Sequence, residues 1–225
     1  MTSAVGRLVV FEGVEGAGKS TQLRRLEARL TRAGVTCRSF REPGGTAAGD
    51  RIREVLLDPA MSLDSRTEAL LFMASRAELV ATAVRPELDA GSVVLLDRFF
   101  LSTYAYQVSG RGLPEVDVIA ANRAATGGVV PDLTVLLTLP FADGMARATN
   151  RGPFDRMEQS GNAFHARVES AFAMFATSEW QATHPEAGPV VVVDAAGTAD
   201  DVEQRIAAVV AEQLPEHGAR LELIA

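Results

Sequence analysis

Residues Gly13 to Ser20 read GVEGAGKS, which places two glycines, a lysine and a hydroxyl residue at the spacing G-x-x-x-x-G-K-[S/T]. Glycines let a backbone curl so that successive N–H groups point inward, where they bind phosphate oxygens. In this pattern Lys19 reaches the β- and γ-phosphates of a nucleoside triphosphate, and Ser20 offers its hydroxyl to Mg²⁺. The predicted nucleotide-binding residues are Gly13, Val14, Glu15, Gly16, Ala17, Gly18, Lys19, Ser20 and Thr21.

The elements on both sides of this loop support the prediction. Arg7 to Glu12 is largely apolar and rich in β-branched residues, which is typical of a buried parallel strand. From Ser20 to Ala33, leucines recur at helical spacing, which predicts an amphipathic helix. A strand that leads through the loop into a helix makes a chance glycine-rich turn the weaker alternative, and the helix N-terminus adds positive potential for phosphate.

A second group of residues follows the apolar run from Val93 to Leu96. Asp97 ends this predicted strand, where a carboxylate opposite Ser20 can hold the water shell of Mg²⁺. A helix N-cap is the alternative role for Asp97. Arg98 is suited to a second phosphate group through paired hydrogen bonds. Two phosphate-bearing ligands at one sheet edge indicate transfer between nucleotides rather than simple hydrolysis.

Composition and charge narrow the class of protein. The chain has 225 residues, of which 47% are hydrophobic, and this is enough for a sizeable core. Its net charge of −7 argues against general binding to nucleic acid or to an anionic membrane. The single cysteine, Cys37, cannot form an internal disulfide and is expected to pack within a strand. No signal peptide or membrane span is predicted, so the expected location is the cytoplasm.

Apolar strands alternate with longer helical patterns along the chain. The predicted strands are 7–12, 36–41, 93–97, 133–139 and 190–194, and the predicted helices after the first are 47–57, 67–90, 116–127, 162–184 and 200–214. This order predicts an α/β fold of the P-loop class, with a five-stranded parallel sheet covered by helices on both faces. We expect one domain over residues 1–214 that includes a lid segment at 149–161, followed by a C-terminal tail at 215–225.

Several longer motifs resemble those of bacterial thymidylate kinases, in the same order along nearly the whole chain. The matching stretches are FEGVEGAGKST at 11–21, REPGGT at 41–46, RTEALLFMASRAELV at 66–80, LLDRFFLSTYAYQVSGRG at 95–112, PDLTVLLTL at 131–139, RGPFDRMEQ at 151–159 and VVDAAGTADDV at 192–202. The REPGGT and DR-x-x-x-S-x-x-A-Y-Q patterns are far more specific than the phosphate-binding loop. The chain is similar to the subtype in which a lid, rather than this loop, supplies the catalytic arginine.

The resemblance implies where the base and sugar of an acceptor nucleotide bind. Phe72 and Arg76 share a helix face that stacks on thymine and hydrogen-bonds it, although a core aromatic and a surface cation are the plainer interpretation of these two. Thr103 and Gln107 form a second pair four residues apart that is aimed at the base. Tyr106 resembles the ring that crowds the 2′ position of the sugar and excludes ribonucleotides.

The resemblance also implies the catalytic and phosphate-binding groups. Glu15 resembles the carboxylate that faces the acceptor, and Arg53 resembles an acceptor-side arginine, although a solvated helix face explains Arg53 equally well. Gly16 stands where a related subtype carries an arginine in the loop. Arg151 in the lid is therefore the predicted catalytic arginine, together with Lys19, Arg98 and Glu15; Arg147 and Arg156 are the nearby candidates that could partly substitute for it.

The implied reaction is transfer of the γ-phosphoryl group of ATP, with Mg²⁺, to dTMP, which gives dTDP and ADP for dTTP synthesis. The proposed metal-binding residues are Ser20 and Asp97, and the backbone near Ala195 to Thr198 is expected to hold adenine. The resemblance also implies a homodimer formed through helices beside the acceptor site. Two alternatives remain open from the residues: a kinase for another nucleoside monophosphate or a deoxynucleoside, and a P-loop switch ATPase.

Overall fold

The computed structural model describes residues 6–140, 143–144, 147 and 155–215. Its centre is a five-stranded, fully parallel sheet, as predicted, and the strand order is β2-β3-β1-β4-β5. The strands are β1 (Arg7–Gly13), β2 (Cys37–Arg41), β3 (Val93–Asp97), β4 (Leu133–Thr138) and β5 (Val190–Asp194). The three central strands are buried almost throughout, which explains their continuous apolar sequences.

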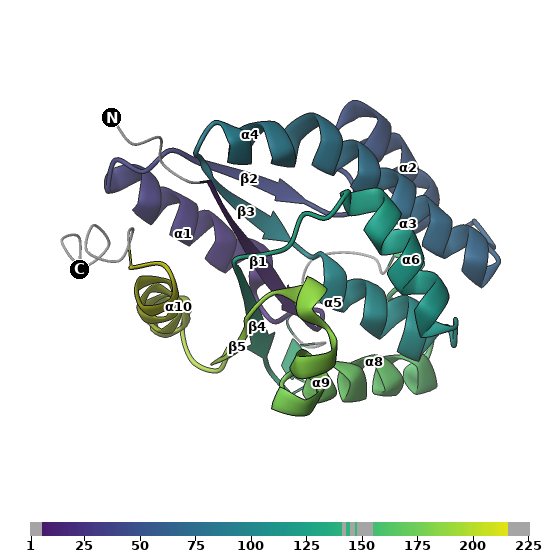
Figure 1. Ribbon diagram of the computed structural model, residues 1–225. Coiled ribbons are helices and arrows are strands. Elements are labelled where there is room, and N and C mark those ends of the chain that lie inside the picture. Colours follow the sequence, from purple (N-terminus) through teal and green to yellow (C-terminus); the bar gives the residue numbers. More distant parts are fainter. Residues whose placement is uncertain (1–5, 141–142, 145–146, 148–154, 216–225) are drawn as a thin grey trace.

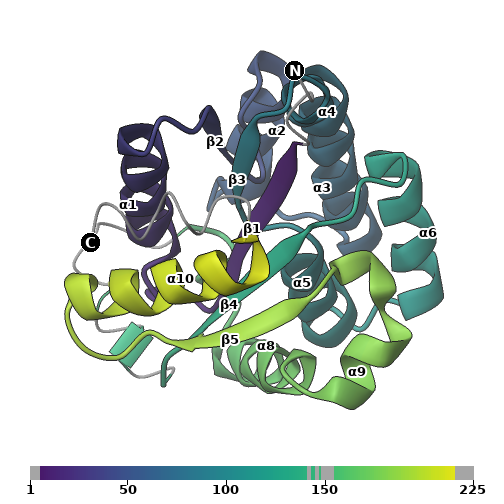
Figure 2. The same ribbon diagram turned by 60° about the vertical axis from the view of Figure 1, so that its left-hand side comes forward.

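Helices cover both faces of this sheet (Figures 1 and 2). On one face lie α1 (Lys19–Arg32) and α10 (Ala199–Gln213), whose apolar stripes pack against the strands. The other side carries the helices that follow β2, β3 and β4. They are α2 (Ala47–Leu57), α3 (Ser65–Leu79), η1 (Val80–Val84), α4 (Arg85–Asp89), α5 (Phe100–Thr103), η2 (Tyr104–Gly110), α6 (Glu115–Thr126), α8 (Asn162–Phe175) and α9 (Ser178–Thr183), with the short helix η3 (Pro185–Ala187).

Capping side chains explain where several helices begin. The Thr46 side chain accepts a hydrogen bond from the backbone N–H of Gly49 at the start of α2, and Asp64 accepts one from Arg66 at the start of α3. At α10, Thr198 and Asp201 form a reciprocal capping box. These caps start the helices within one or two residues of the predicted positions.

Two predicted helices differ from the structure in detail. The pattern at 67–90 becomes α3 and α4 joined by the π-helical turn η1, so the helix is continuous but widened. The pattern at 162–184 is wrong as one helix, because α8 ends at Phe175 and the Thr177 side chain caps a new helix, α9. The segment 100–110, for which no helix was delimited, is the short helix α5 followed by the π-helical segment η2.

The parallel topology brings the carboxyl ends of all strands to one edge of the sheet. The loop before α1, the turn after β2, and Asp97 and Arg98 after β3 meet there. The cysteine predicted to pack in a strand is buried in β2 and free, as expected. Of the predicted lid at 149–161, only residues 155–161 lie within the described residues, and of the predicted tail only 215 does.

Candidate active site

A pocket of about 670 Å³ opens at the carboxyl edge of the sheet. One end is lined by residues 15–22 of the loop and α1 and, after β5, by residues 195 and 197–199. The other end is lined by the turn after β2 and by side chains of α3, α5 and η2. A crevice at this edge of a parallel sheet is where ligands bind in doubly wound folds.

The loop from Gly13 to Gly18 forms the floor between the two ends. Helix α1 begins at Lys19 without a side-chain cap, which leaves its N-terminus available to an anion. The Lys19 ammonium is buried and donates to the backbone oxygens of Gly13 and Val14, at 2.9 and 2.7 Å. These two are the only predicted loop residues that do not line the pocket; they position Lys19 instead.

A side chain at Gly16 would be crowded and strained. The φ of this glycine is +74°, and a Cβ atom there would lie 1.9 Å from the backbone oxygen of Gly144. A side chain at this point would displace the segment that contains Gly144 or strain the loop. An arginine at this point of the loop would therefore require a local change of the backbone.

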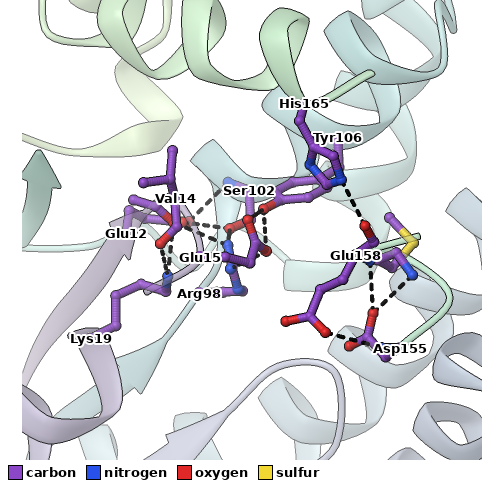
Figure 3. A network of polar contacts seen from close by, with 12 residues as sticks. Glu12, Val14, Glu15, Lys19, Arg98, Ser102, Tyr106, Asp155, Glu158 and His165 are labelled. Carbon is purple, nitrogen blue, oxygen red and sulfur yellow. Dashed lines mark hydrogen bonds and ion pairs between the residues drawn. The ribbon is translucent and has the colours of Figure 1, made fainter. Parts of the chain in front are cut away.

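Glu15 lies between two donors on the acceptor side of the loop, as Figure 3 shows. Its carboxylate accepts from Arg98 at 2.9 Å and from the Tyr106 hydroxyl at 2.5 and 2.7 Å. Burial raises the pKa of Glu15, but the charges of Arg98 and Lys19 and the Tyr106 hydrogen bond outweigh burial and lower it. Glu15 is therefore an anion that fixes Arg98 and Tyr106 in place.

Arg98 has a left-handed backbone, with φ of 72°, directly after β3. Such a conformation costs about 1–3 kcal/mol outside glycine and is held by surrounding contacts. Its guanidinium donates to Ser102 at 2.8 Å, and Ser102 donates in turn to Glu12 at 2.6 Å. Burial lowers the pKa of Arg98, but the negative charges of Glu15 and other acidic groups nearby outweigh it and raise it, so the guanidinium stays charged.

The fully buried Glu12 was not singled out in the sequence. Besides Ser102, its carboxylate accepts the backbone N–H groups of Phe99 and Ser102, at 2.7 and 3.0 Å. These N–H groups lie at the start of α5, which follows the neighbouring strand β3. A carboxylate from β1 therefore accepts hydrogen bonds from the free backbone N–H groups at the N-terminus of that helix. Glu12 thereby holds the turn that carries Arg98 (Figure 3).

Ser20 and Asp97 lie together, as expected for a metal site. The Ser20 hydroxyl is 2.5 Å from the Asp97 carboxylate. The alternative role of Asp97 as a helix N-cap is wrong, because α5 begins at Phe100 and has no side-chain cap. A hydroxyl beside one carboxylate fits Mg²⁺, which keeps several waters and takes further oxygens from phosphates. A cluster of three or more His, Cys, Asp or Glu residues is absent from the described residues.

At the acceptor end, Arg76 is buried within a polar cluster rather than exposed. It forms an ion pair with Glu42, and it also donates to the Thr103 hydroxyl, the Asn122 side chain and the Phe99 backbone oxygen. Oxygen atoms of the protein thus accept hydrogen bonds from all five N–H groups of Arg76. An oxygen atom of a bound ligand would have to share one of these N–H groups with the protein. Burial raises the pKa of Glu42 against the opposing effect of Arg76. The plainer interpretation of Arg76 as a surface cation is wrong, since it is 3% exposed.

The remaining predicted acceptor residues line the same end. Phe72 is partly buried one turn from Arg76 on α3, and Thr103 and Gln107 face the pocket from α5 and η2. Arg53 lines the pocket as well, and it donates to the Pro43 backbone oxygen at 2.9 Å. It therefore stabilises the turn after β2, which a freely solvated helix face does not explain.

The three arginines near the predicted lid differ in position. Arg151 lies outside the described residues. Arg156 is anchored away from the pocket, because its side chain donates to the Leu56 backbone oxygen and to Glu68, both at 2.7 Å. Arg147 lines the donor end of the pocket and donates to the Ala195 backbone oxygen at 3.4 Å.

Sequence reasoning missed the buried carboxylates Glu12, Glu42 and Glu68. Glu42 stands inside the REPGGT motif, so its spacing could have drawn attention to it, whereas Glu12 ends an otherwise apolar strand. Glu68 lies in a helix with charged neighbours, and nothing in the sequence distinguishes it from a solvated residue. Each becomes recognisable only when its partners from distant segments are known.

Comparisons with known proteins agree with this geometry. The family model described as thymidylate kinase matches residues 11–206. Thymidylate kinase from Deinococcus radiodurans is 46% identical over 208 residues, which cover 92% of this chain and 98% of the relative. Its counterpart from Pseudomonas fluorescens is 45% identical and covers 89% and 93% of the two chains.

A solved structure supports the same assignment. The crystal structure of thymidylate kinase from Ehrlichia chaffeensis superposes with a TM-score of 0.71 at 28% identity, covering 92% of this chain and 98% of that one. Similarity to thymidylate kinases thus extends along nearly the full length of the chain, in addition to the sheet, the phosphate-binding loop and the pocket. The chain belongs to the thymidylate kinase family.

Proposed function

We propose that this pocket carries out the reaction of the family, ATP-dependent phosphorylation of dTMP to dTDP, with the roles assigned below. The observation that supports the assignment most is the junction of Lys19, Glu15 and Arg98. The charges of both Lys19 and Arg98 act on the Glu15 carboxylate, and we assign Lys19 to the donor side and Arg98 to the acceptor side. Two phosphate groups bound there face each other across the loop, which is the arrangement that transfer between nucleotides requires.

In this reaction an oxygen of the dTMP phosphate attacks the γ-phosphorus of ATP in line. The bond from that phosphorus to the β–γ bridging oxygen breaks, and its electrons leave with ADP. The attacking phosphate is already ionised at neutral pH, so no general base is needed, and positioning and charge neutralisation supply the catalysis. We assign Lys19 to the β- and γ-phosphates, Arg98 to the acceptor phosphate, and Arg151 to the phosphoryl group in transit.

We propose that Ser20 and Asp97 hold Mg²⁺, directly or through water. When bound, the ion neutralises phosphate charge and orients the triphosphate. Residues 15–21 of the loop surround the phosphates through backbone N–H groups, while Gly13 and Val14 hold Lys19 through their backbone oxygens. Adenine is assigned to the donor end near Ala195 to Thr198, which lines the pocket mostly through small residues.

The acceptor base is assigned to the space beside Phe72, Thr103 and Gln107. Phe72 offers a ring for stacking, and Arg76 holds the surrounding polar groups and reaches the base edge. Tyr106 is fixed by Glu15 where the sugar must pass, so its ring is the group that excludes a 2′-hydroxyl. Arg53 adds positive charge at the same end.

Two properties of the whole protein complete the proposal. A homodimer is supported by Leu70 on α3 and Val116 on α6, which are 64% and 71% exposed on helices beside the acceptor end. Sedimentation equilibrium tests it, and a monomer at micromolar concentration would refute it. We place the protein in the cytoplasm, where its buried thiol stays reduced and nucleotides are made. No helix of the described residues is long and apolar enough to cross a membrane.

A panel of nucleoside monophosphates tests the assignment of the acceptor. With ATP and Mg²⁺ present, ADP formation is measured for dTMP, dUMP, dCMP, dAMP and dGMP. We expect dTMP to give the highest kcat/KM and dUMP to lose about 1–3 kcal/mol, the usual contribution of one apolar group in a fitted pocket. Equal efficiency with dCMP or dAMP would show a kinase for another acceptor.

A further inference from the structure

Glu68 is a buried carboxylate outside the pocket that joins three segments of the acceptor side. Its side chain on α3 is 1% exposed. It accepts hydrogen bonds from Gln107 on η2 at 3.1 Å, from Arg111 at 3.0 Å through two nitrogens, and from Arg156 at 2.7 Å. None of the roles assigned above includes Glu68.

The two arginines keep Glu68 ionised. Burial raises the pKa of a carboxyl group, but the hydrogen bonds and charges of Arg111 and Arg156 outweigh burial and lower the pKa of Glu68. A carboxylate without a proton has four lone-pair positions and no donor. Whatever polar group packs against Glu68 must therefore donate.

This requirement fixes the side-chain amide of Gln107. The two ends of a glutamine amide look alike by shape, so their assignment follows from the hydrogen-bond network. Because Glu68 only accepts, the NH₂ group of Gln107 must face it, and the Oε1 oxygen takes the opposite side. Gln107 is 2% exposed and lines the pocket, and no described residue donates to its Oε1.

The same carboxylate also holds the turn that follows residue 154. Arg156 donates to the Leu56 backbone oxygen at the end of α2, and Arg111 donates to Ser160 at 3.1 Å. The arginines that ionise Glu68 thus belong to contacts between α2, η2 and residues 155–160. The orientation of Gln107 is locked by the packing of the whole acceptor side.

We infer that Glu68 is a positioning residue that turns the carbonyl oxygen of Gln107 toward the acceptor base and so selects a base with an N–H at that edge. This inference rests on the proposed binding of dTMP. Thymine presents an N3–H donor between two carbonyls, whereas cytosine has an unprotonated nitrogen at the same place. The fixed carbonyl oxygen of Gln107 accepts a hydrogen bond from the N3–H of thymine. With cytosine, the same oxygen faces an unprotonated nitrogen, so two hydrogen-bond acceptors oppose each other.

The test compares Glu68→Gln, Gln107→Leu and the double variant with the native chain, using kcat/KM for dTMP and dCMP. Where dCMP gives no turnover, its inhibition constant replaces kcat/KM. A glutamine at position 68 can donate, so the Gln107 amide is free to turn. The ratio of dTMP to dCMP should fall at least about tenfold in Glu68→Gln. In the Gln107→Leu background the added Glu68→Gln change should leave the ratio unaltered.

A matched control is Glu54→Gln, which removes the charge of an exposed helix glutamate, 64% exposed, and should alter neither ratio nor melting temperature. An unchanged ratio in folded Glu68→Gln would overturn the inference, as would an equal fall in the Gln107→Leu background. A native chain that forms no ADP with dTMP would instead refute the proposed function.

If Glu68→Gln does not fold, hydrogen exchange on the native chain decides the question. The side-chain NH₂ of Gln107, identified by its loss in Gln107→Leu, should exchange far more slowly than that of exposed Gln213. It should also remain protected when dTMP binds. Exchange as fast as that of an exposed glutamine would show that Glu68 does not hold the amide.

Discussion

Tyr106 has two separable features, a ring that we assign to the sugar position and a hydroxyl that donates to Glu15. Tyr106→Phe keeps the ring and should preserve the preference for dTMP over ribothymidine monophosphate. It removes a hydrogen bond to a charged group, which contributes about 1.5–3 kcal/mol, so Glu15 and Arg98 lose part of their alignment and kcat/KM for dTMP falls. Tyr106→Ala should lower kcat/KM for dTMP and, unlike Tyr106→Phe, should also reduce the preference for dTMP over ribothymidine monophosphate.

Steady-state kinetics with both acceptors checks this pair of variants. If Tyr106→Ala keeps the native ratio, the ring does not exclude the 2′-hydroxyl. If Tyr106→Phe loses as much selectivity as Tyr106→Ala, the hydroxyl rather than the ring is responsible. The two variants therefore separate steric exclusion from alignment of Glu15.

Lys19 gives a prediction about pH. Burial, followed by repulsion from Arg98, lowers the pKa of the free Lys19 ammonium to about 8. A bound triphosphate favours the charged form and raises the pKa again, so nucleotide binding takes up a proton at any pH between the two values. Near pH 8 the uptake should be about half a proton per ATP, and it should vanish toward pH 6.5, where Lys19 is already charged.

Calorimetric titration with ATP in two buffers of different ionisation enthalpy measures this uptake. Lys19→Met is the control, because it has no proton to gain. Equal binding enthalpies in both buffers at pH 8 would show that the ammonium is fully charged in the free protein.

At the scale of elements, two arginines near the predicted lid are expected to have different roles, Arg151 in catalysis and Arg156 in anchoring the segment to α2 and α3. Arg151→Ala should lower the single-turnover rate by about 10³, the lower end for an arginine that meets the phosphoryl group, while dTMP binding changes little. Arg156→Ala should instead lower stability, by about 1–3 kcal/mol, because it leaves Glu68 and the end of α2 with fewer donors.

Rapid-quench measurements and thermal unfolding of both variants distinguish these roles, with Arg51→Ala, whose side chain is 81% exposed, as the control. A normal chemical step in Arg151→Ala would move the catalytic role away from Arg151. A larger chemical loss in the folded Arg156 variant would contradict the anchoring role that its contacts with Leu56 and Glu68 indicate.

The elements also show which features a sequence reveals. The strands and α1, α2, α6 and α10 were predictable because apolar periodicity and capping residues such as Thr46 and Thr198 mark them locally. The break between α8 and α9 was missed because one threonine cap inside a helical pattern is a weak signal. The π-helical segment η2 was missed because its wider turn follows no simple apolar period.

For the site, sequence motifs identified the residues that line the pocket, but not the buried residues that hold those side chains in position. Lys19, Ser20, Asp97 and Arg98 stand at fixed positions of strand ends and loop, so parallel topology alone brings them together. The supporting carboxylates depend on contacts between distant segments: Glu12 accepts from a residue 87 positions away, Glu42 from one 34 positions away and Glu68 from one 39 positions away. From the sequence alone, an acidic residue in a strand or helix is expected to be exposed to solvent. Its buried role becomes evident only when the hydrogen-bond donors from distant segments are known.

At the scale of the whole molecule, the parallel sheet turns scattered motifs into one pocket with a donor end and an acceptor end. Residues of α1 and α10 line the end that we assign to the donor, while residues of α3, α5 and η2 line the end that we assign to the acceptor. The end-to-end arrangement also separates a kinase from a switch ATPase, since a switch needs no second small-molecule site.

Product analysis tests this central claim most directly. The native chain is incubated with ATP, Mg²⁺ and dTMP, and the nucleotides are quantified by anion-exchange chromatography, with a parallel sample that lacks dTMP. We predict equal molar amounts of dTDP and ADP, and little ADP without the acceptor. Formation of ADP without dTDP, at the same rate with and without dTMP, would contradict the account.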